Sequence, residues 1–87
     1  LTPLLYTYSR CNLEIFQSLL RRGADPSVGD VQGDTVLHLA CRDGDQEYID
    51  NLLIHSRINI NQKNFSGNSA VMLAAIYGHI SLVEYLI

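Results

Sequence analysis

One spacing limits what this 87-residue chain can fold into more than any other feature of its sequence. The segment Gly33–Gly44, which begins Gly-Asp-Thr-Val-Leu-His, is matched by the segment Gly67–Gly78 at an offset of 34 residues. The opening Thr2-Pro3-Leu4 matches the same pattern at an offset of 33. Because a single unit of this length cannot bury its apolar face alone, the period predicts several similar units stacked side by side.

Within each unit, the pattern predicts a turn that leads into a short helix. In the middle unit, Thr35 is a good N-cap because its hydroxyl can accept a bond from a free N–H of the first helical turn. His38, three residues later, can reach back to the cap as the acidic residue of a capping box does. Gly44 supplies the left-handed residue that stops the helix. Small and apolar residues share one face of this helix, which lets a second helix approach closely: Leu37, Ala40 and Cys41.

These features together resemble the ankyrin-repeat family over essentially the whole chain. The resemblance is carried by the capped repeat start, the Ala-Ala or Ala-Cys pair, the Leu-Leu of a second helix and the Gly23-Ala24-Asp25 tail. It implies an all-α solenoid of stacked antiparallel helix pairs joined by β-hairpin loops. We expect residues 1–87 to form one ankyrin-repeat domain, a fragment of a longer array, with repeats at about 1–29, 30–62 and 63–87.

The apolar stripes place the expected helices along the chain. The first repeat should contain helices from Pro3 to about Arg10 and from about Leu13 to Arg22, and the second helix of the next repeat should run from about Gln46 to His55. Residues 24–34 are expected to form an extended β-hairpin. The first repeat departs from the family in two ways, because Cys11 replaces a glycine and Tyr6 and Tyr8 replace small residues.

No residue pattern indicates catalysis, a metal or a cofactor. His38 is explained by helix capping, and Cys41 occupies a position that is usually a buried alanine. The histidines and cysteines lack the spacing of zinc ligands, and the glycines form neither a phosphate loop nor a dinucleotide fingerprint. Asn61 lies where asparagine hydroxylation occurs in ankyrin proteins, although hydrogen bonding in the hairpin explains an asparagine there equally well. We therefore expect a protein that is not an enzyme.

The distribution of charge is uneven. Residues 30–50 carry a net charge of −5, whereas segments 1–29 and 51–87 each carry +1. This acidic centre disfavours nucleic acid as a partner, because contacts to phosphate need basic side chains. It would suit a basic protein segment, or it is simply a solvated face that keeps the array soluble. The acidic centre consists of six residues: Asp30, Asp34, Asp43, Asp45, Glu47 and Asp50.

The resemblance also implies where a partner would bind, because ankyrin arrays use the tips of their hairpins and the outward face of their first helices as a concave groove. Carried onto this chain, the groove of the second repeat consists of Val31, Gln32, Asp34, Arg42 and Asp43. The groove of the third repeat consists of Phe65, Ser66, Asn68, Ile76 and Tyr77. The apolar members of the third repeat are either anchors for a partner or residues covered by a following repeat.

The expected function is recognition of a protein partner, alongside contacts to neighbouring repeats of the same chain. The Gly33–Cys41 segment and the Asn64-Phe65-Ser66-Gly67 lead-in are similar to repeats of the NF-κB inhibitor family, which implies sequestration of a transcription factor as one alternative. Another is targeting of an attached enzyme, such as a ubiquitin ligase, to its substrate. A third is a scaffold in a membrane protein. No apolar run reaches the roughly 18 residues of a membrane span, and the isolated cysteines suggest an intracellular protein, cytoplasmic or nuclear.

Overall fold

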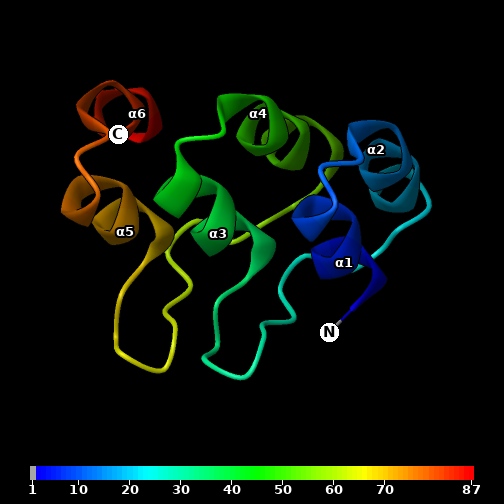
Figure 1. Ribbon diagram of the computed structural model, residues 1–87, viewed down its shortest axis with the longest axis horizontal. Coiled ribbons are helices and arrows are strands. Elements are labelled where there is room, and N and C mark those ends of the chain that lie inside the picture. The colour runs from blue at the N-terminus through cyan, green and yellow to red at the C-terminus, as the bar shows by residue number, and fades with distance from the viewer. Residues whose placement is uncertain (1) are drawn as a thin grey trace.

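The computed structural model describes residues 2–87, which form six helices in three consecutive pairs (Figure 1). The three pairs stack along the molecule, with α1, α3 and α5 in one layer and α2, α4 and α6 in the other. The loops that precede α3 and α5 project on the side of the first layer. The helices are α1 (Pro3–Ser9), α2 (Leu13–Arg21), α3 (Val36–Asp43), α4 (Gln46–His55), α5 (Ala70–Ile76) and α6 (Ile80–Leu86). The expected all-α solenoid is therefore confirmed.

Small residues hold the first layer together, as the sequence predicts. Ala40 and Cys41 on α3 and Ala74 on α5 are completely buried, and α3 packs more extensively against α5 than any other two helices pack. A short side chain at these positions lets the two backbones approach closely. The buried apolar residues form one continuous core across all three helix pairs.

An aromatic cluster fills the core between the first two pairs. The ring of Tyr48 lies edge-on to Tyr8 and to Phe16, with ring centroids 4.9 and 4.8 Å apart, which is a favourable aromatic geometry. Tyr8 is therefore a core residue, whereas Tyr6 on the same helix is half exposed. Ile15 and Leu53, apolar residues of α2 and α4, are exposed at the margins of these helices.

The predicted helix starts and stops are present in detail. The hydroxyl of Thr2 accepts a bond from the Leu5 N–H, and Thr35 forms a complete capping box with His38. Gly44 ends α3 with φ of 70°. Cys11, at the equivalent end of α1, also adopts a positive φ, of 56°. A residue with a Cβ is strained there by about 1–2 kcal/mol, so the surrounding fold imposes this conformation on the cysteine.

The loops differ from the extended hairpins that were expected, because no β-strand forms within residues 2–87. Each loop closes through two backbone bonds. In the first loop, the Asp30 N–H donates to the Asp34 carbonyl at 3.0 Å and the Gly33 N–H to the Asp30 carbonyl at 2.9 Å. In the second, the Asn64 N–H donates to the Asn68 carbonyl at 2.9 Å and the Gly67 N–H to the Asn64 carbonyl at 3.0 Å. The side chains of Asp30 and Asn64 each accept two further backbone N–H bonds inside their own loop. These side-chain bonds satisfy the loop backbone in place of a β ladder.

Replacing Thr35 with alanine is expected to lower the free energy of unfolding by about 1 kcal/mol, because the first turn of α3 loses its cap. Urea unfolding followed by circular dichroism measures this change. Ser18→Ala, which removes an exposed hydroxyl from α2, serves as the matched control and should leave the midpoint nearly unchanged. An equal loss in both variants would mean that the Thr35 cap contributes nothing specific.

Candidate functional site

The ten residues predicted to bind a partner lie at two levels of the molecule. One group lies at the loop tips, and the other lies at the carboxyl ends of α3 and α5. Asp34 and Asn68 are half-buried, and the other eight residues are exposed. The loop group consists of Val31, Gln32, Asp34, Phe65, Ser66 and Asn68, and the helix-end group consists of Arg42, Asp43, Ile76 and Tyr77.

Four of these residues present large apolar side chains to solvent. Val31 is 92% exposed and Phe65 81% at the loop tips, while Ile76 is 64% exposed and Tyr77 56% at the end of α5. Large apolar side chains that are exposed to solvent are candidates for contacts with a partner. We refer to these four residues below as the apolar anchors.

The two loops are tied to each other, which fixes the position of Phe65. Its N–H donates to the Gln32 carbonyl at 3.0 Å, and the Asn64 side chain donates to Asp34 Oδ1 at 2.8 Å. The Phe65 ring lies directly against Gly33, where a Cβ would fall 2.7 Å from the ring. Asp34 therefore holds the loops together, which sequence reasoning did not reveal.

His38 links the second helix pair to the third. Its Nδ1 accepts from the Thr35 N–H at 3.1 Å, and its Nε2 lies 2.9 Å from the Asn68 carbonyl. Because a carbonyl can only accept, Nε2 must carry the proton and the ring is the neutral Nε2–H tautomer. The predicted capping role of His38 is confirmed, and its bond to the following repeat is an addition that only the structure reveals.

The carboxyl end of α3 carries a bonded group of polar side chains. The Arg42 guanidinium contacts Asp43 with both Nε and Nη2, and the Tyr8 hydroxyl lies 2.7 Å from Asp43 Oδ2 and 3.3 Å from the Leu39 carbonyl. The Arg42 bond holds the pKa of Asp43 below its usual range, and burial together with the nearby carboxylate raises the pKa of Tyr8. Asp43 is thus already neutralised within the chain.

Tyr8→Phe is expected to cost about 1 kcal/mol of unfolding free energy, because it removes one hydroxyl shared between two acceptors. The loss should shrink in an Asp43→Asn background, since the stronger acceptor is then altered. A double-mutant cycle from urea unfolding measures this coupling. Additive effects of the two substitutions would show that the 2.7 Å contact does not contribute to stability.

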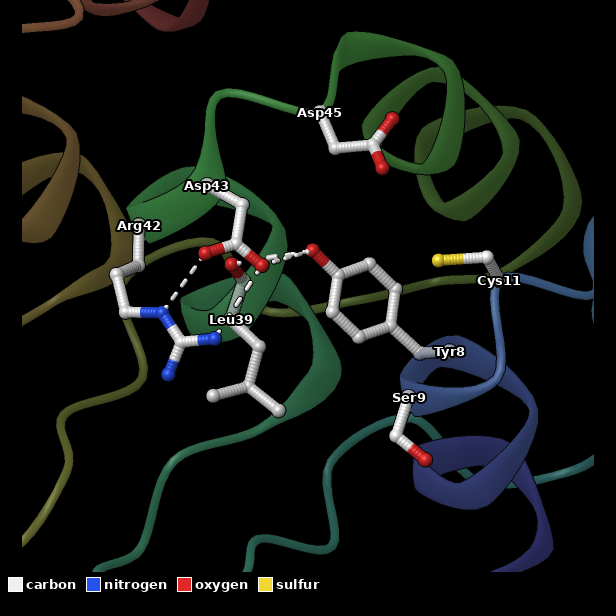
Figure 2. A pocket seen from close by; sticks show the side chains of 7 residues that line it. All are labelled: Tyr8, Ser9, Cys11, Leu39, Arg42, Asp43 and Asp45. Atoms are coloured by element: carbon white, nitrogen blue, oxygen red, sulfur yellow. Dashed lines mark hydrogen bonds and ion pairs between the residues drawn. The ribbon is translucent and has the colours of Figure 1, made fainter.

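A cavity of about 300 Å³ opens beside this group, between the carboxyl ends of α1 and α3 (Figure 2). In Figure 2 the carboxylate of Asp45 and the thiol of Cys11 lie at its edge with no bond to the other residues drawn. Sequence reasoning did not select these two positions as candidate binding residues. The lining residues are Tyr8, Ser9, Cys11, Leu39, Arg42, Asp43 and Asp45.

The residues that could carry chemistry are placed as follows. Both cysteines are free thiols, and burial raises the pKa of Cys41 to about 12, so this thiol stays protonated near neutral pH. Among residues 2–87, no three His, Cys, Asp or Glu side chains converge as a metal site would require. No helix in the described part of the chain is long and apolar enough to cross a membrane.

Comparisons with known proteins agree with this architecture. A family model described as ankyrin repeats (3 copies) matches residues 4–87. The chain is 33% identical to NF-kappa-B inhibitor alpha of Sus scrofa and 33% identical to the nuclear factor NF-kappa-B p105 subunit of Rattus norvegicus. It is 34% identical to the probable E3 ubiquitin-protein ligase XBOS33 of Oryza sativa subsp. japonica.

Each of these three alignments covers 99% of this chain, but the chain spans only 29%, 9% and 16% of the respective relatives. The similarity therefore extends over the repeats alone. A model of three tandem repeats matches nearly every residue, and three stacked helix pairs occupy the same span. The chain thus belongs to the ankyrin repeat family, whose repeats are protein-interaction modules.

Proposed function

We propose that this chain recognises a protein partner that lies across its second and third repeats. The exposure of the apolar anchors supports this proposal most directly, since Phe65, Ile76 and Tyr77 leave large apolar areas in water. Burying such side chains gives roughly 25 cal/mol per Å². Aromatic residues near the middle of an interface are also the usual sites of its largest energetic contributions.

The acidic centre supports a partner that carries a basic segment. Within residues 2–87 Asp43 is paired with the cation Arg42, so the other five carboxylates of the acidic centre contribute most of the uncompensated negative field. Such a field acts mainly on the rate of association and on its salt dependence. The proposal therefore assigns affinity to the apolar anchors and steering to the acidic centre.

The proposed module binds without catalysing a reaction of its own, and it acts inside the cell, cytoplasmic or nuclear. The two free cysteines support a reducing compartment. Two alternatives have support in the names of relatives: the inhibitors suggest sequestration of a transcription factor, and the rice ligase suggests substrate targeting for an attached enzyme.

A comparative capture experiment tests the proposed surface. Wild-type protein, a Phe65→Ala/Tyr77→Ala variant and an Ile15→Ala/Ile54→Ala variant are each immobilised and incubated with the same cell extract. The control pair removes exposed apolar side chains from α2 and α4, the layer away from the loops. Quantitative mass spectrometry should identify a protein that the groove variant loses and the control variant retains.

With the captured partner in hand, the groove variant should dissociate at least about tenfold faster than wild type, because a truncated anchor costs more than 1 kcal/mol. Its melting temperature should change little, because both side chains are mainly in solvent. Unchanged binding together with a lower melting temperature would show that these side chains stabilise the fold and that the proposed surface is wrong.

Removing two unpaired charges from the acidic centre with Asp45→Asn/Glu47→Gln is expected to slow association by about threefold at low salt, with a weaker dependence on ionic strength. Stopped-flow or biolayer interferometry with the captured partner measures both. Glu14→Gln/Glu84→Gln removes the same charge from outside the acidic centre and is the control. Equal behaviour of the two variants would show that the acidic centre does not steer a partner.

A further inference from the structure

The three repeats place different side chains at one equivalent position, the residue before the second helix of each pair. Asn12 caps α2 by accepting the Ile15 N–H, as an asparagine at an N-cap normally does. Asp45 and His79 make no such bond to α4 and α6. Their side chains are therefore free to serve the interface with the preceding repeat.

His79 shows what this position can do. Its Nε2 donates to the Arg42 carbonyl at 2.8 Å, at the carboxyl end of α3 in the preceding repeat. The ring also covers Gly44, where a Cβ would fall 2.8 Å from ring atoms. An N–H donor thus satisfies one of the carbonyls that a helix leaves unpaired at its carboxyl end.

The preceding interface lacks this imidazole because Asp45 occupies the equivalent position. A shift of 33 residues matches Arg42 with Ser9 and Gly44 with Cys11, and both Ser9 and Cys11 line the 300 Å³ cavity together with Asp45. No residue within 2–87 donates a hydrogen bond to the Ser9 carbonyl. The cavity is therefore the space that the His79 ring fills one repeat later.

The cavity is rich in acceptors and poor in donors. The carboxylate of Asp45 forms no hydrogen bond or ion pair with residues 2–87, so its negative charge is uncompensated. The lining cation, Arg42, is already bound to Asp43 through two nitrogens. The carboxyl ends of α1 and α3 also meet here, and the negative end of a helix favours a cation.

Tyr48 packs edge-on against the ring of Tyr8, one of the residues that line the cavity. Its side chain is 4% exposed, and its hydroxyl has no hydrogen-bond partner among the described residues. The pKa of Tyr48 is raised first by burial and then by Cys11 and Asp45, two residues that line the cavity.

We propose that this cavity binds one cationic side chain, an arginine or a lysine, of the protein that occupies the groove. The cation donates to the Asp45 carboxylate and to the Ser9 carbonyl, in the place that the His79 ring occupies at the next interface. An ammonium brings three N–H donors and a guanidinium five, which matches the surplus of acceptors. This inference rests on the proposed function and names a specificity pocket next to the proposed groove, with which it shares Arg42 and Asp43.

The experiment uses small probes, so that it does not depend on the unidentified partner. The ¹⁵N-labelled chain is titrated with Nα-acetyl-arginine amide, with Nα-acetyl-lysine amide and with the uncharged isostere Nα-acetyl-citrulline amide. Both cationic probes should shift the amide signals around Ser9, Cys11 and Asp45 saturably, whereas the citrulline probe should not. The proposed cation pocket would be contradicted if neither cationic probe gave saturable shifts, or if the citrulline probe gave shifts of equal size.

Three variants locate the site. Asp45→Asn should weaken binding of the cationic probes by about fivefold, because it removes a partly exposed charge partner. Glu84→Gln makes the same charge change on α6 and should change the affinity for the cationic probes by less than about twofold. Asp45→His should fill the cavity as His79 does and abolish binding in a protein that remains folded. Unchanged affinity in Asp45→Asn would contradict the assignment.

The outcome is separable from that of the proposed function. Loss of the partner in Phe65→Ala/Tyr77→Ala tests the groove, and probe binding tests the cavity between α1 and α3. If the apolar anchors prove essential for partner binding while the probes do not bind, the proposed groove is supported and the proposed cation pocket is contradicted. If the probes bind while the anchors prove irrelevant, the cavity is a cation site and the proposed groove is wrong.

Discussion

His38→Ala is expected to lower the free energy of unfolding by about 3 kcal/mol, a large share of the roughly 5–15 kcal/mol that stabilises a small domain. The side chain is 1% exposed, so its removal leaves a cavity. It also leaves the Thr35 N–H and the Asn68 carbonyl without their partner. An unsatisfied buried polar group costs about 1–3 kcal/mol, so these two groups dominate the loss.

Urea unfolding of His38→Ala, Thr35→Ala and the double variant measures both the loss and its coupling. The two side chains contact each other at 2.9 Å, so the double variant should be more stable than the sum of the single losses implies. His55→Ala, at the exposed end of α4, is the control and should be nearly neutral. A loss below about 1 kcal/mol in His38→Ala would mean that the bond between the repeats contributes little.

Gly33→Ala is expected to cost about 3 kcal/mol, the second-largest effect. Gly33 has φ of 77°, where a side chain adds about 1–2 kcal/mol of strain. The added Cβ would also lie 2.9 Å from the Phe65 backbone nitrogen, which sits in the bond that joins the two loops. Relieving this contact requires the second loop to move, so the variant should also weaken partner binding through Phe65.

Gly67→Ala separates strain from contact. Gly67 has nearly the same φ, 81°, but a Cβ there would meet nothing within 4 Å. It should therefore lose only the strain, about 1–2 kcal/mol. Thermal and urea unfolding of the two variants give the difference, which measures how tightly the loops are packed against each other. Equal losses would indicate that the second loop moves freely away from Gly33.

Much of the fold follows from local sequence. The caps Thr2 and Thr35 and the stop at Gly44 depend only on residues within one turn, so the sequence predicts the helix ends within one or two residues. The sequence did not reveal that Cys11, which replaces the glycine of the family, would keep a glycine-like conformation. The small residues of α3 and α5 predict that these helices pack closely, because the volume of each side chain follows directly from the sequence.

The sequence also places the apolar anchors in solvent correctly, because each lies in a loop or at the end of a helix, away from the core. The sequence does not reveal which charged side chains lack a bonding partner within the chain. Asp34 and Asp43, both candidate binding residues, are bonded to Asn64 and to Arg42 and Tyr8. Their partners lie up to 35 residues away, and no local pattern encodes such a distance.

Local chemistry by itself thus determined the repeats, their helix ends and the side chains that each repeat turns outward. Only the tertiary structure decided how one repeat meets the next. His38 and His79 bind carbonyls of neighbouring repeats, whereas Asp45 leaves the equivalent space open. The physical reason is that caps and stops depend on bonds within one turn, while a bond or cavity between repeats depends on the relative position of two backbones, which is set by the packing of the whole stack.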